Sequence, residues 1–129
     1  MPVTHVPVTI ADATTYTVLA DNAGLMHYWP NFSSSCTATL PDPKAGMWFE
    51  FAYNGVAADA QNFIISTGSN TNYFIGGVQF IDNDTDVVAP VQPDGNSNSE
   101  LTIVTPEVGT RIRIESANGT TWNLSGFVG

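Results

Sequence analysis

The chain has 129 residues, a formal net charge of −9, and only three basic side chains against twelve acidic ones. Its length suits a single domain, and a hydrophobic content of 43% argues against global disorder. The scarcity of Lys and Arg argues against binding to nucleic acid or to an anionic membrane, because both need many basic side chains. A polar surface built from Thr, Ser and Asn favours strands and turns over helices.

The chain begins with an extended arm, predicted over residues 1–12. Pro2 and Pro7 remove two backbone donors and favour an extended backbone. Near its end the arm is expected to pair as an edge strand.

Strands are then predicted from alternating apolar and polar residues. In the first half of the chain they cover 13–20, 25–30, 36–41 and 47–53. The segment 41–46, with two prolines and a glycine, cannot continue a strand and must be a corner between its neighbours.

The aromatic row of the strand over 47–53 is predicted to face the core. It consists of Met47, Phe49, Phe51 and Tyr53. The outward positions of the same strand include Trp48 and Glu50.

Further strands are predicted over 62–67, 72–81, 99–105, 110–116 and 121–128. Two local features accompany them. Adjacent glycines at 76 and 77 indicate a bulge or a close backbone approach, and the sequence NGTT at 118–121 indicates a tight hairpin.

The segment 82–98 is expected to be a long acidic loop. No window of helical length shows a helical period. We therefore predict an all-β protein: a single jelly-roll-like β-sandwich over residues 13–129, with eight to nine short antiparallel strands.

Catalytic side chains are few. His5 lies in the arm, and His27 lies in a strand beside aromatic residues. No nucleophile motif accompanies either histidine. Glu50 stands in mid-strand, where a lone outward carboxylate is usually solvated. We expect no enzymatic activity and no cofactor.

Asp82, Asp84 and Asp86 stand at alternate positions, as in the first half of a calcium loop. The pattern then fails, because Val87 and Pro93 occupy the positions that need Gly and Glu. A solvated acidic turn is the favoured interpretation, with a looser cation site as the weaker alternative.

Three aromatic residues are considered for ligand contact: Tyr28, Trp29 and Trp48. Together with Trp122 they would stack on a sugar ring if their faces were exposed. In a small β-domain, however, a tryptophan more often belongs to the core, and both interpretations stay open.

Three segments in order, 15–24, 37–51 and 111–126, carry the patterns T-Y-T-V-L-A…G, T-A-T-L-P-x-P-x-A-G-x-x-F-x-F and R-I-x-I-x-S-x-x-G-T-x-W-x-x-S-G. Together they resemble small β-sandwich proteins of tailed-phage particles, chiefly capsid decoration (cement) proteins and related head or tail-fibre modules. The sequence departs from that pattern at 82–98 and at the aromatic stretch 26–32.

The resemblance implies a structural protein on the exterior of a virion, made in the host cytoplasm. It also implies a homotrimer that binds the major capsid protein and stabilises the shell, because a trimer matches the local threefold points of a capsid lattice. A receptor- or carbohydrate-binding module of a fibre is the alternative.

The arm is the expected capsid contact, by strand addition to an exposed sheet edge, with several arms acting together. Its residues are Pro2, Val3, Thr4, His5, Val6 and Pro7. A frayed terminus is the competing interpretation.

Overall fold

The computed structural model describes residues 6–69, 71–82, 85 and 87–129. Within these residues there are twelve strands and one short 3-10 turn, η1 (Ala20–Asn22). The strands are β1 (Val8–Thr9), β2 (Thr15–Thr17), β3 (Met26–Trp29), β4 (Cys36–Thr39), β5 (Met47–Tyr53), β6 (Phe63–Ser66), β7 (Phe74–Gly76), β8 (Val78–Asp82), β9 (Val87–Val91), β10 (Glu100–Ile103), β11 (Arg111–Ser116) and β12 (Trp122–Val128).

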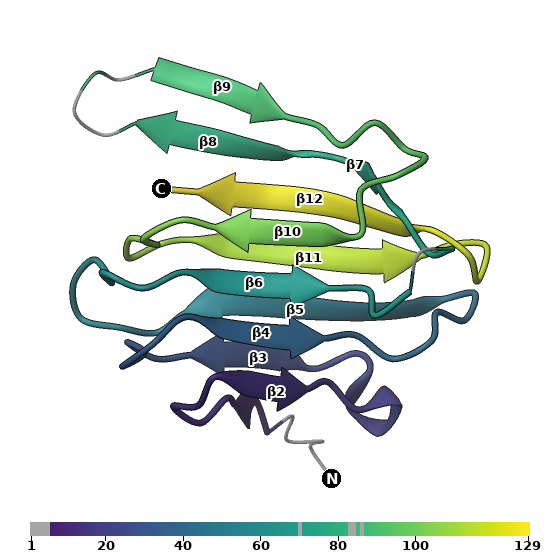
Figure 1. The fold of residues 1–129 in the computed structure, drawn as a ribbon, viewed down its shortest axis with the longest axis horizontal. Helices are drawn as coiled ribbons and strands as arrows, with labels where there is room; N and C mark the ends of the chain where they lie inside the picture. Colours follow the sequence, from purple (N-terminus) through teal and green to yellow (C-terminus); the bar gives the residue numbers. More distant parts are fainter. Residues whose placement is uncertain (1–5, 70, 83–84, 86) are drawn as a thin grey trace, which may run out of the picture.

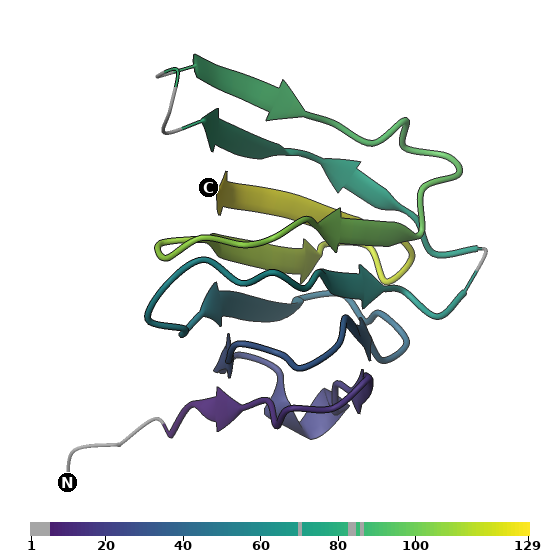
Figure 2. The ribbon, with the colours of Figure 1, turned by 60° about the vertical axis from the view of Figure 1, so that its left-hand side comes forward.

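The strands form two sheets that lie as two layers (Figures 1 and 2). Sheet A has the order β1-β3-β5-β11-β12-β8-β9, with β7 also paired to β12. Sheet B has the order β10-β6-β4-β2. Figure 1 shows that β8 and β9 extend past β10, so sheet B does not cover that end of sheet A.

The first six strands wind between the two sheets. Of these six, β1, β3 and β5 belong to sheet A and β2, β4 and β6 to sheet B. From β3 to β6, each strand lies parallel to the strand two before it in the chain. This winding arises because the connections cross from one layer to the other instead of folding back as hairpins. The proline-rich segment 41–46 is such a crossing, and its predicted role as a corner is confirmed.

The all-β prediction is confirmed, but the antiparallel prediction is wrong. Among the described residues, six of the ten strand pairs are parallel, and both sheets are mixed. The jelly-roll likeness remains a prediction.

The described residues also form more strands than the eight to nine expected. Gly76, with a φ of +81°, ends β7, so the single strand predicted over 72–81 is divided into β7 and β8. Residues 87–91, expected as loop, form β9 against β8. The N-terminal edge strand is confirmed as β1, and Ile10, just after it, is fully buried.

The core lies between the sheets, as the alternation predicts. In β5, Phe49 and Phe51 are fully buried, and in β11 Ile112 and Ile114 are buried between outward polar residues. The predicted hairpin at 118–121 joins β11 and β12.

His27 is a fully buried titratable group of this core. Its ring lies between Phe49 and Phe51, at centroid distances of 5.6 and 5.1 Å. Nδ1 is 3.1 Å from the carbonyl oxygen of Leu25, whereas Nε2 is buried without a partner. Burial lowers the pKa of His27 from its ordinary value of 6.5.

The free energy of unfolding is therefore expected to fall on acidification below about pH 6.5, because the unfolded chain then binds a proton that the folded chain excludes. The expected slope is at most about 1.4 kcal/mol per pH unit. Urea unfolding at several pH values measures this slope. A His27→Leu variant is expected to show a flatter profile in the same window, and equal slopes in the two proteins would contradict the assignment to His27.

Candidate docking surface

The structure separates the three aromatic residues that sequence analysis considered for ligand contact. Trp29 is 0% exposed and stacks on Phe63, with ring centroids 4.4 Å apart. Its prediction as a surface contact is therefore wrong. The physical reason is that β3 presents alternate residues to opposite faces, and His27 and Trp29 share the core face.

Trp48 and Tyr28 are half-buried. The guanidinium of Arg113 lies over the Trp48 ring, with Cζ 4.2 Å from the centroid. One face of this ring is thus already used by the protein, which weakens its case as a sugar platform. Tyr28 lines a shallow hollow together with Val6 and Pro7 of the arm.

Glu50, considered as a catalytic carboxylate, is held by two arginines on the outer face of sheet A. Its oxygens accept hydrogen bonds from Arg111 at 2.9 Å and from Arg113 at 3.2 Å. The hydrogen bond from Arg111 is the largest cause that lowers the pKa of Glu50. An anionic, ion-paired Glu50 is a poor general acid.

The remaining predicted site residues lie mostly outside the described residues. Four arm residues do so: Pro2, Val3, Thr4 and His5. Of the possible cation ligands, Asp84 and Asp86 also do so, and for Asp82 only the backbone at the end of β8 is described. No group of His, Cys, Asp or Glu within the described ranges has the geometry to hold a metal ion.

What sequence analysis missed is an apolar end of the molecule formed by β8, β9, β10 and β12. Most of the exposed large hydrophobic residues in the described part of the chain lie there: Phe80, Val87, Val88, Val91, Val104, Val108 and Phe127. Apart from Val87, they contribute to two separate surfaces, the outer patch and the groove, on opposite sides of sheet A.

The outer patch consists of Ile81, Val88 and Phe127 on the outer face of sheet A, together with Val108 from the connection between β10 and β11. Phe127 is 52% exposed and lines a hollow with Ile81 and Val108. Val88 lies opposite Ile81 in the β8–β9 ladder and therefore shares its face. Arg111 lies opposite Phe127 on β11, so an apolar centre borders a charged rim.

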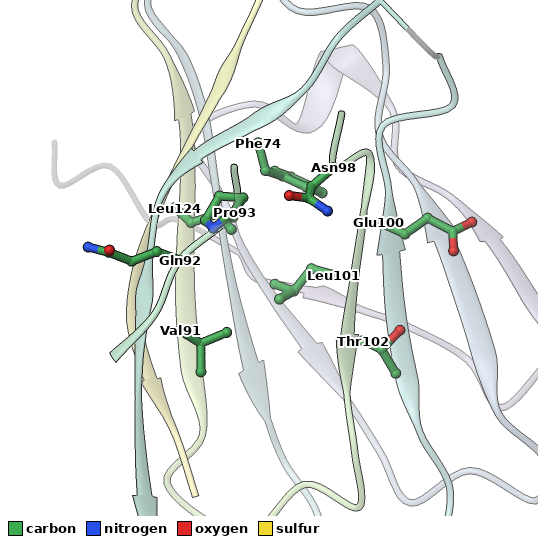
Figure 3. A pocket seen from close by; sticks show the side chains of 9 residues that line it. All are labelled: Phe74, Val91, Gln92, Pro93, Asn98, Glu100, Leu101, Thr102 and Leu124. Carbon is green, nitrogen blue, oxygen red and sulfur yellow. The ribbon is translucent and has the colours of Figure 1, made fainter. Parts of the chain in front are cut away.

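The groove lies on the inner face, between β9 and the free edge of β10. Figure 3 shows Val91 and Pro93 on one side and Leu101 and Thr102 on the other. This cavity, of about 340 Å³, shares Val91, Leu101 and Thr102 with a second cavity of about 300 Å³. The second cavity is walled by apolar residues that include Phe80, Val104 and Val128. Together the two cavities follow the whole length of β10.

The two sheet edges at this end differ in their capacity to accept another strand. β9 is the outermost strand of sheet A, and Pro90, the fourth of its five residues, has no backbone N–H, which blunts that edge. β10 is the outermost strand of sheet B and contains no proline.

The hydrogen-bond pattern shows which backbone groups of β10 face the groove. The carbonyl of Ser99 accepts from the N–H of Thr67 beyond the end of β6, so odd-numbered residues face β6. The carbonyl of Asn98 accepts from Phe74 on the opposite side at 2.8 Å. Glu100 and Thr102 therefore direct their backbone groups into the groove.

One sequence signal could have indicated this end. Residues 87–91 read VVAPV, an apolar run without alternation inside an otherwise polar segment. Such a run fits neither a half-buried strand nor a solvated loop, and it is typical of a strand with apolar residues on both faces.

Comparisons of the chain with protein-family models, with curated proteins and with solved structures found no match. Among the described residues, no helix is long and apolar enough to cross a membrane.

Proposed function

We propose that this protein is a non-catalytic structural subunit that attaches to the exterior of a larger protein assembly through the outer patch. The supporting observation is the outer patch itself, an exposed apolar surface with a charged rim on the outer face of sheet A. Exposed apolar clusters bordered by polar residues are typical of protein docking sites.

The sequence resemblance suggests which assembly this is: the head of a tailed phage, with the major capsid protein as the partner. On that proposal the protein decorates the capsid as an oligomer, with the jelly-roll-like sandwich as its body. Binding to the assembled shell alone would stabilise the shell by mass action. The fibre alternative has less support, because Trp29 is buried and Arg113 covers Trp48.

Phe127→Lys is expected to weaken attachment to phage heads by at least about tenfold, because large apolar anchors dominate docking energy and a lysine would be desolvated there. Purified protein is added to heads that lack it, and the bound fraction is measured by co-sedimentation. Phe127 is largely exposed, so its replacement leaves the core intact.

Leu19→Lys is the matched control. Leu19 is 54% exposed, follows β2 at the other end of the fold, and lies outside both apolar surfaces. Its variant is expected to bind like the unmodified protein. Equal binding of the Phe127 variant would contradict attachment through the outer patch, and equal rupture temperatures of heads with and without the protein would contradict a cementing role.

A further inference from the structure

We propose that the groove beside β10 receives the N-terminal arm of a second copy of this chain, so that copies link head to tail. In the inserted state, residues 3–6 of one copy add a strand to sheet B of its neighbour. This inference does not depend on attachment to a phage head. It gives the arm a partner in the neighbouring copy in place of the capsid.

The groove has the features that strand addition requires. The backbone groups of Glu100 and Thr102 are directed into it, and apolar side chains of β8, β9 and β12 form the facing wall. An added strand would thus gain backbone hydrogen bonds on one side and cover Phe80 and Val91 on the other. The edge of β9 cannot offer the same, because Pro90 blunts it.

The arm matches the groove in length and in charge. Four residues with backbone N–H groups, Val3 to Val6, lie between Pro2 and Pro7, and β10 is also four residues long. In either register, Val3 or Val6 faces the apolar wall, since side chains alternate along a strand. Residues 1–10 contain no acidic side chain, so this strongly acidic chain does not repel its own arm at Glu100.

The arm of the same copy cannot reach the groove. Val6 lies two residues before β1, which limits its distance from β1 to about 7 Å. Five strand spacings separate β1 from β8 in sheet A, which is about 24 Å. The arm and the groove therefore lie at opposite ends of one subunit, and the contact must be between copies.

A head-to-tail contact of this kind closes into a ring when its rotation divides a full turn. The trimer implied by the sequence resemblance is one such ring. Each subunit then donates one arm and receives one.

The test is the oligomeric state in solution, measured by light scattering after gel filtration. The full chain is expected to be oligomeric. Thr102→Pro removes a backbone donor that faces the groove and leaves the bonds to β6 in place, so it is expected to weaken association about tenfold or more and to yield monomers. Thr102→Ala keeps the backbone donor and is expected to assemble like the unmodified protein.

A second variant disables the arm through Val3→Asp and Val6→Asp, and it is also expected to be monomeric. Mixing it with the Thr102→Pro variant restores one intact arm and one intact groove. The mixture is therefore expected to form a 1:1 heterodimer that cannot grow further. This outcome also shows that both variants are folded.

A monomeric full chain would overturn the proposal. So would unchanged assembly of either the Thr102→Pro or the arm variant, or a mixture that stays monomeric. None of these results bears on attachment to phage heads, which the Phe127→Lys experiment tests. Failure of arm insertion and failure of attachment through the outer patch can therefore be distinguished.

Discussion

Replacing Trp29 by alanine is expected to lower the free energy of unfolding by about 3–5 kcal/mol. The side chain is fully buried, stacks on Phe63, and lies 5.9 Å from the Tyr53 ring between centroids. Its removal leaves a cavity between the two sheets that rigid strands on both sides cannot close. Urea denaturation measures the loss, with the slope of the transition as a check that unfolding stays two-state.

Trp48→Ala is the control for this prediction. Trp48 is half-buried on the outer face of sheet A and contacts Arg113, so its loss is expected to cost about 1 kcal/mol or less.

Fluorescence gives a second readout of the burial of Trp29. In a Trp48→Phe variant, the remaining emission of Trp29 and Trp122 is expected to resist acrylamide, because both are 0% exposed. Equal costs for the two alanine variants would refute the assignment of Trp29 to the core.

Gly126→Ala is expected to destabilise the protein by about 2–6 kcal/mol, the sum of backbone strain and overpacking. Gly126 has a φ of +129°, a conformation that residues with a side chain rarely adopt. A Cβ at this position would lie 2.1 Å from the carbonyl oxygen of Arg111 and 2.9 Å from the Cα of Ile112. Both contacts are with the backbone of β11, so β11 and β12 would have to separate. Thermal or urea unfolding measures the loss.

Gly109→Ala separates the two causes. Gly109 also has a positive φ, of +100°, but a Cβ there would meet nothing within 4 Å. Its replacement is expected to cost only the backbone strain, about 1–3 kcal/mol. If both variants lost the same stability, the close approach of β12 to β11 would not be the cause.

Strand positions could be predicted from sequence wherever one face of the strand is buried. In β5 and β11 the apolar and polar residues alternate strictly, and the burial of Phe49, Phe51, Ile112 and Ile114 follows that pattern. The signal is local, because a period of two residues can be recognised within a single strand.

Strand pairing could not be predicted in the same way. Whether β4 pairs with β5 as a hairpin or sits parallel to β6 depends on where the connection at 41–46 leads, and both outcomes need the same turn residues. Tertiary packing decides between them, and no local pattern records it.

The candidate site was hidden from sequence for a related reason. Val91 and Val104 each look like ordinary strand or loop residues, and only the uncovered end of sheet A brings them together in the groove. Trp29 shows the opposite case. The alternation in β3 separates Trp29 from Tyr28, but it does not say which of the two faces the core.

The position of β11 has a consequence for synthesis of the chain. β11 lies in the middle of sheet A and joins β5 to β12, with Arg111 opposite Ala52. A ribosome must therefore synthesise residues 111–116 before β5, the last of the first three strands of sheet A, can pair with β11. Until then the edge of β5 is open to other nascent chains, and we expect folding to be slow, since contacts distant in sequence form last.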